Sequence, residues 1–165
     1  MALYGGSRDV SFWKRINEEL IIDLIDTEVL YYKLVLDETR GNLYGESDKK
    51  SYFDPVVMPA LVNREEQNFA ADDFGADYQI NAKFAFLRDT LVERALYVEV
   101  GDVIQWDNEY YEVDGIIENQ YLVGKNPSTW LGGDTHGHDL SLICNAHLTR
   151  RDRLNLVDTR AGLNG

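Results

Sequence analysis

The sequence is poor in cysteine and has no long apolar run. Its 165 residues include a single cysteine, Cys144, so no disulfide can form within the chain, and a reducing compartment is expected. No apolar segment approaches the length of a membrane span, and residues 1–6 lack the pattern of a signal peptide. These absences predict a soluble protein of the intracellular type that does not bind membranes.

Positive charge is also scarce. The chain has 16 lysines and arginines against 29 acidic residues, which gives a net charge of −13 and a pI near 4.5. Such a surface repels phosphate and disfavours a protein that grips nucleic acid, but it suits a passage through which DNA moves without sticking. Hydrophobic residues make up 44% of the sequence and aromatic residues 12%, as in folded chains. The length favours one well-buried domain.

Several short segments have the two-residue periodicity of β-strands. In residues 98–127, apolar and polar side chains alternate in three short runs separated by polar turns, the first turn being Asp107-Asn108-Glu109. This pattern predicts an antiparallel meander. Further strands are expected at 27–36, 78–86 and 140–148, and 51–62 is expected at a sheet edge or in an extended arm because Pro55 and Pro59 cannot donate to a central ladder. We therefore predict a mainly β protein, a small antiparallel β-barrel or sandwich.

Two helices are expected. In residues 9–26, apolar side chains recur at helical spacing, and a stripe this apolar needs a partner surface, either the protein's own sheet or a neighbouring subunit. A short helix is predicted over 88–95, with Asp89 as its N-cap.

The predicted organisation is an N-terminal arm (1–8), one domain (9–148) and a C-terminal extension (149–165). Two long loops are expected inside the domain, at about 37–51 and 63–77. The second loop is acidic and contains Phe69 and Phe74, and long loops of this kind often carry interactions. The extension is basic, with Arg150, Arg151 and Arg153, which suits an acidic neighbouring surface.

Residues with metal-binding chemistry occur close together near the C-terminus. His136, His138 and His147 fall within a dozen positions of one another, with Cys144 between them, and a His-x-His pair is how cupin-type metal enzymes begin their site. The downstream glutamate of that pattern is missing. The simpler interpretation, which we favour, is a loop tip and a core cysteine. The chain also lacks the spacing of a calcium loop, a phosphate loop or a serine nucleophile elbow, so we expect no metal, no cofactor and no catalysis.

The order of features resembles the neck, or head-completion, proteins of T4-type contractile-tailed bacteriophages. The resemblance covers roughly residues 10–150, and the arginine-containing tail after Leu148 departs from it. The matching pieces are an N-terminal helix that leads into the strand 27–36, the Leu43-Tyr44-Gly45-Glu46 element, the acidic excursion, the segments 78–87 and 88–95, and the hairpin from Gly101-Asp102-Val103-Ile104 to Tyr110-Tyr111-Glu112-Val113.

The resemblance implies a non-enzymatic virion protein that is assembled in the host cytoplasm. It would form a ring, expected to be a hexamer, between the portal side and the tail side of the neck, and DNA would pass through the lumen without sequence-specific binding. A tail-terminator ring is one alternative, and a cupin-like metal enzyme that uses His136, His138 and His147 is another. The residues expected to bind partners are Leu43, Tyr44, Glu46, Phe69, Phe74, Arg150, Arg151 and Arg153.

Overall fold

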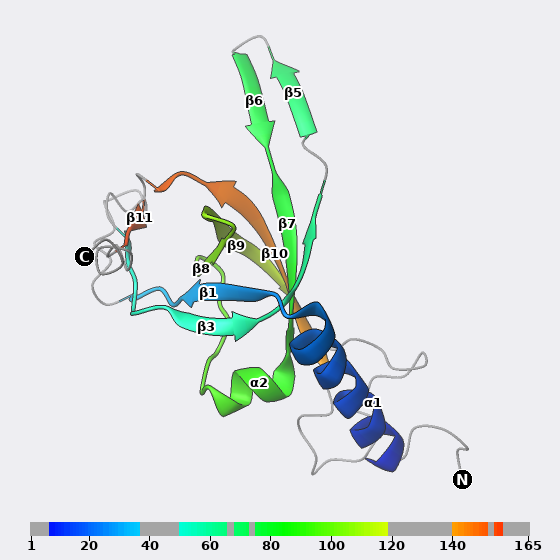
Figure 1. Cartoon of the computed structure of the whole chain (residues 1–165). Coiled ribbons are helices and arrows are strands. Elements are labelled where there is room, and N and C mark those ends of the chain that lie inside the picture. Colours follow the sequence, from blue (N-terminus) through cyan, green and yellow to red (C-terminus); the bar gives the residue numbers. More distant parts are fainter. Residues whose placement is uncertain are drawn as a thin grey trace, which may run out of the picture.

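A seven-stranded antiparallel sheet with a helical N-terminal segment forms the centre of the computed structural model (Figure 1). The structure describes residues 7–36, 50–65, 68–72, 75–118, 140–151 and 154–156. The helical elements are α1 (Ser7–Glu19), the π-helix η1 (Leu20–Ile25) and α2 (Arg88–Glu93). The strands are β1 (Glu28–Tyr32), β2 (Lys50–Ser51), β3 (Val56–Pro59), β4 (Leu61–Arg64), β5 (Asn68–Asp72), β6 (Gly75–Gln79), β7 (Asn81–Leu87), β8 (Val103–Trp106), β9 (Glu109–Ile117), β10 (Ser141–Thr149) and β11 (Leu154–Asn155).

The sheet curls because one short segment supplies both of its edges. The strand order is β3-β1-β8-β9-β10-β7-β4, so β3 and β4 lie at opposite ends of the order, yet only Ala60 separates them in the chain. Ala60 is fully buried and its N–H donates to the carbonyl of Thr27 at 2.9 Å. The expectation of an edge strand around Pro55 and Pro59 is confirmed. The protein is mainly β, as predicted. Because β3 and β4 do not pair with each other, the sheet is not closed into a barrel.

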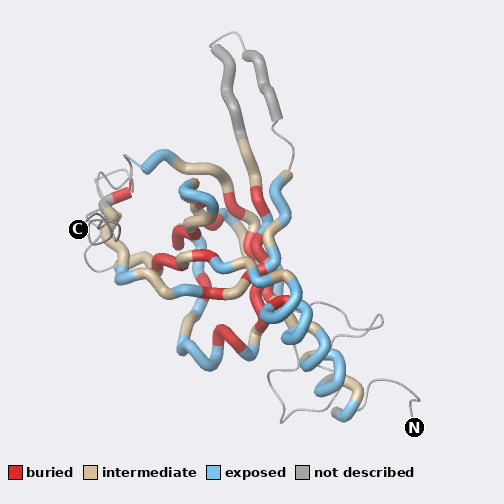
Figure 2. The backbone as a smooth tube through the Cα atoms, in the orientation of Figure 1, coloured by how far each residue is buried: buried red, intermediate tan, exposed pale blue. Residues whose placement is uncertain are grey.

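The hydrophobic core lies inside this curl. Alternate residues of the central strands are buried, as Phe84 and Phe86 in β7 and Tyr111 and Val113 in β9 illustrate (Figure 2). The rings of Phe84 and Tyr111 meet edge to face with centroids 5.4 Å apart. Each large side chain buried in this way contributes about 1.5–3 kcal/mol to folding. The two-residue periodicity seen in the sequence is therefore the periodicity of core contacts.

Residues 98–118, the described part of the stretch predicted as a three-stranded meander, form a hairpin, and residues 119–127 lie outside the described residues. Residues 98–100 precede β8 without joining it, and β9 is one nine-residue strand that absorbs the predicted break near Asp114. There the pairing of β9 with β10 shifts register, because Asn145 pairs with Gly115 and Ala146 pairs with Val113. Asp114 is thus the extra residue of a β-bulge, which bends the strand without ending it. The predicted reversal after β8 is confirmed, with positive φ at Asp107 and Asn108.

The predicted acidic loop at 63–77 is wrong. Its backbone forms the end of β4 and the hairpin of β5 and β6, with Asn68 opposite Gln79 and Asp72 opposite Gly75. The hairpin continues the β4–β7 pair and projects from the sheet as an arm (Figure 1). Acidic residues are uncommon in strands, so the composition of this segment did not predict them. The strands form because β5 and β6 hydrogen-bond to each other.

The helices begin and end differently from the prediction. The expected N-cap Asp89 lies inside α2, and the cap position is Leu87, whose side chain makes no capping bond. The reason is that β7 runs directly into α2 with no connecting residue. The N-terminal helix reaches Ile25 as expected, but its last turn and a half widens into η1 and ends at Asp26 in the left-handed region. Of the helices in the described part of the chain, none is long and apolar enough to span a membrane.

The C-terminal extension is tied to the domain where the structure describes it. β11 pairs in parallel with β2, and Leu154 is buried against Tyr32 and Val103. Residues 37–49 of the first predicted loop and 157–165 of the extension lie outside the described residues.

This packing predicts the effect of shortening Leu154. Leu154→Ala is expected to lower the free energy of unfolding by about 2 kcal/mol, because it removes a buried side chain that closes the Tyr32–Val103 cluster. Urea denaturation measures the change, and Arg150→Ala at the exposed end of β10 is the control. A loss below about 0.5 kcal/mol, the level of an ordinary surface substitution, would contradict the packing of β11.

Candidate functional site

The Gly101-Asp102 pair, which carries much of the family resemblance, forms a buried junction between strands. The Asp102 side chain is fully buried, and its carboxylate accepts hydrogen bonds from the Tyr31 hydroxyl, the Lys33 ammonium at 3.1 Å, the Leu34 N–H at 2.9 Å and the Glu99 N–H at 2.8 Å. Four donors around one carboxylate satisfy a charge that would otherwise be costly to bury. The junction holds the end of β1 against the turn that precedes β8.

Gly101 completes this junction. It has φ +93°, and a Cβ placed there would lie 3.4 Å from Leu34 Cδ2. Its N–H donates to the Val113 carbonyl at 2.9 Å, and the Val113 N–H donates to the Asp102 carbonyl, also at 2.9 Å. Glycine is the residue that tolerates this backbone conformation. The motif is therefore explained by its structural role, and the Asp102 side chain is closed off from solvent.

Two titratable groups near Asp102, the Tyr31 phenol and the Cys144 thiol, are held neutral. Burial, followed by the charge of Asp102, raises the pKa of Tyr31 far above its usual value, so the phenol remains a proton donor. Burial also raises the pKa of the Cys144 thiol to about 12. A thiol in that state is a poor nucleophile and a poor metal ligand at neutral pH.

The proposed metal ligands do not converge where they are described. Cys144 points into the core from β10, whereas His147 lies on the other face of that strand, with Nδ1 2.8 Å from Asp114. Within the described residues no three histidine, cysteine, aspartate or glutamate side chains come together as a metal site. His136 and His138 lie outside the described residues.

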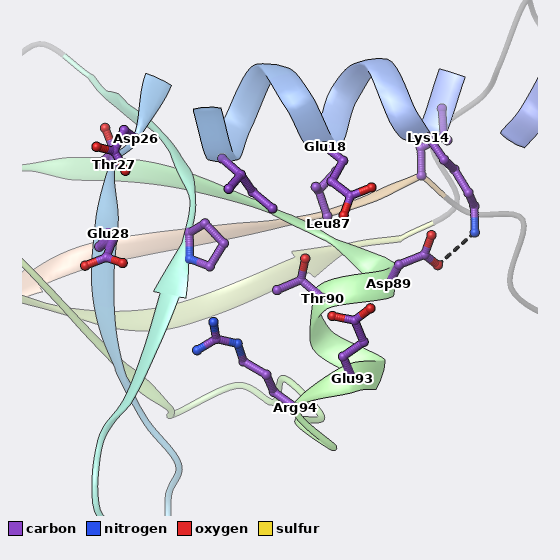
Figure 3. Close-up of a pocket in the computed structure, with 13 residues that line it drawn as sticks. Lys14, Glu18, Asp26, Thr27, Glu28, Leu87, Asp89, Thr90, Glu93 and Arg94 are labelled. Atoms are coloured by element: carbon purple, nitrogen blue, oxygen red, sulfur yellow. Dashed lines mark hydrogen bonds and ion pairs between the residues drawn. The ribbon is translucent and has the colours of Figure 1, made fainter. Parts of the chain in front are cut away.

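The clearest hollow in the described part of the chain is a groove of about 190 Å³ between α1–η1, α2 and the start of β1 (Figure 3). Glu18 from α1 and Glu93 from α2 point toward it, and Lys14 joins Asp89 across it at 2.8 Å. Five carboxylates and two cations line the groove: Glu18, Asp26, Glu28, Asp89, Glu93, Lys14 and Arg94. The described lining residues include no histidine or cysteine, and their net charge is negative.

An exposed apolar face follows the N-terminal helix. Phe12 is 59% exposed, Trp13 42%, Ile16 37% and Leu20 39%. Ile21, on the opposite side of the helix, is buried against the domain. Figure 2 shows the helix in pale blue over most of its length as it runs away from the sheet. This stripe of exposed large apolar side chains is hereafter called the outer face of α1, and exposed apolar patches often mark interaction sites.

The residues predicted to bind partners have different outcomes. Leu43, Tyr44, Glu46, Phe74 and Arg153 lie outside the described residues. Phe69 lies in β5 of the arm, and Arg150 and Arg151 are exposed at the end of β10.

The arm and the arginine-containing segment leave the sheet at the same end. The Leu148 N–H donates to the carbonyl of Ile80, the residue that joins β6 to β7, at 2.8 Å. Two elements that are far apart in the sequence and were predicted separately are thus neighbours. The acidic groove was not predicted, because its carboxylates come from distant segments with no shared spacing.

The Asp102 junction predicts a large effect of a small change. Asp102→Asn is expected to lower the free energy of unfolding by about 3 kcal/mol or more, because the amide places N–H groups against donors that need a charged acceptor. Glu99→Gln is the matched control: it removes only the half-exposed ion pair with Lys33, and the expected cost is below about 1 kcal/mol. Equal costs for the two variants, measured by urea denaturation, would contradict this role of Asp102.

The raised pKa of Tyr31 predicts a loss of stability in alkali. The folded chain keeps the phenol proton while the unfolded chain releases it above pH about 10, so this contribution is complete below about pH 10 and decreases above it. The stability gap between the natural chain and Tyr31→Phe should therefore shrink by about 1.4 kcal/mol per pH unit above pH 10. Urea denaturation at several pH values measures the gap, and a constant gap would contradict the prediction.

Comparison with known proteins does not assign the chain to a family: no family model matches it, and no curated protein matches it.

Proposed function

We propose that this chain is a structural subunit of the neck of a tailed bacteriophage, a head-closure adaptor that forms a ring between portal and tail. The observation that carries an assembly role is the outer face of α1. It exposes Phe12, Trp13, Ile16 and Leu20 on an element that extends away from the sheet. A chain that acts alone seldom leaves such a face in water, because contact with another protein removes it from solvent at a gain of about 25 cal/mol per Å².

The arm supports the same role. An isolated two-stranded hairpin is at best marginally stable, and the arm of β5 and β6 has no further strand paired with it among the described residues. Unpaired strand edges are surfaces on which a neighbouring chain can add a strand. Contacts of this head-to-tail kind, repeated about an axis, close into a ring, for which six copies are expected from the family resemblance.

The charge of the chain fits a channel for DNA. A net charge of −13 repels the phosphate backbone, so packaged DNA would pass through the lumen without binding. The assignment to the neck in particular rests on the resemblance of the hairpin from Gly101 to Val113 and of the order of elements around it.

Removing the arm tests the ring. Asn68 and Gln79 are paired, so an Asn-Gly turn in place of residues 69–78 can join them without disturbing β4 or β7. We expect negative-stain images of the full chain mixed with portal and tail proteins to show rings, and we expect the shortened chain to stay folded by circular dichroism while its rings are lost.

Two results would contradict the proposal. One is a natural chain that forms no ring even with portal and tail proteins present. The other is stoichiometric metal in the purified protein that is lost on His136→Ala, which would favour the cupin-like enzyme instead.

A further inference from the structure

The charges beside the outer face of α1 are arranged in an unusual order. Arg8, Arg15, Glu19 and Asp23 are all exposed and follow one another at steps of seven, four and four residues, which places them along one flank of the apolar stripe. The flank is therefore positive in its N-terminal half and negative in its C-terminal half.

This order opposes the dipole of the helix. The N-terminus of a helix favours negative charge and the C-terminus favours positive charge, yet no basic residue lies in the last turn of α1 or η1. Asp9 is the one acidic residue of the first turn. Arg15 and Glu19 offset part of this effect because they form an ion pair with each other within the helix at 3.0 Å. Arg8 and Asp23 remain as the flank charges that the helix dipole disfavours.

A second α1 that runs in the opposite direction would cover the apolar stripe and would place a charge of opposite sign beside each flank charge. If two helices cross at Ile16, Phe12 of one copy lies opposite Leu20 of the other, and the apolar stripes cover each other. Arg8, eight residues before Ile16, then lies beside Asp23 of the other copy, which is seven residues after it. A two-fold axis brings the same flank of each helix together, so each positive half meets a negative half. In a parallel pair the charged flank would instead face the other flank of the partner helix, which carries none of these four residues.

We propose that two copies of the free chain pair through the outer faces of α1 as an antiparallel helix pair. The pair is self-complementary in both shape and charge. Because a two-fold contact closes with two copies, it cannot build the ring, whose contacts run head to tail. The pairing is therefore an additional property of the free chain, and it covers the apolar stripe before the subunit meets its neighbours.

Sedimentation equilibrium of the purified full chain tests the pair. The natural chain is expected to form dimers, and Ile16→Arg at the crossing point is expected to weaken dimerisation roughly tenfold or more, because it buries a charge against its own copy. Val92→Arg, on the exposed side of α2, is the matched control and should leave dimerisation unchanged. A natural chain that stays monomeric, or equal effects of the two arginines, would overturn the proposal.

Charge exchange tests the direction of the pair. Arg8→Glu and Asp23→Lys should each weaken dimerisation several-fold, and the double variant should restore it, because the exchanged charges again oppose each other across the pair. Each single change improves the match to the helix dipole, so thermal stability of the monomer should not fall. Weakening that the double variant does not rescue would overturn the charge pairing.

Cross-linking gives a second measure of direction. A mixture of Arg8→Cys and Asp23→Cys chains, treated with a short bis-maleimide, should give mainly mixed dimers. The native Cys144 is fully buried and should not react. Dimers of Arg8→Cys with itself would show a parallel pair and overturn the proposal. A natural chain that forms rings with its neighbours but no dimers when free would overturn the pair and leave the proposed function standing, so the two proposals can fail separately.

Discussion

The buried carboxylate of Asp102 is the constraint on which the rest of the fold depends. A charge in the core must be surrounded by donors, and here the donors come from Tyr31, Lys33 and Leu34 on one side and the Glu99 N–H on the other. These groups meet only when β1 and the turn before β8 are both in place. The hairpin of β8 and β9 is thereby fixed beside β1. Its position in turn determines which side chains of the neighbouring strands face inward.

The curl of the sheet has a separate cause. β3 and β4 are consecutive in the chain but belong to opposite edges, so Ala60 is the point where the two edges meet. A larger side chain has no room at a residue that is fully buried and whose N–H is bonded to Thr27. The curl encloses the core and leaves α1 and the arm projecting from it, and these two elements are the ones on which the proposed assembly role rests.

The Gly101-Asp102 pair has a structural explanation that does not depend on the family resemblance. This pair lies at the start of the segment on which the resemblance rests. The core junction explains both residues, because Gly101 has a positive φ and the Asp102 carboxylate has four donors. The candidate ligands Cys144 and His147 do not come together, because Cys144 is buried and His147 lies on the other face of its strand. The features that suit assembly are instead the outer face of α1 and the arm.

The sequence by itself determined the mainly β class, the N-terminal helix, the edge position of residues 51–62 and the strands expected at 78–86 and 140–148. These follow from local rules: two-residue periodicity, helical spacing and the missing N–H of proline. Only the tertiary structure decided that 63–77 forms a paired arm, that Asp114 is a bulge and that Asp89 does not cap α2. It also decided which carboxylates gather in the groove and that the arm and Arg150 share one end. Each of these depends on contacts between segments distant in the sequence, and local pattern carries no information about such contacts.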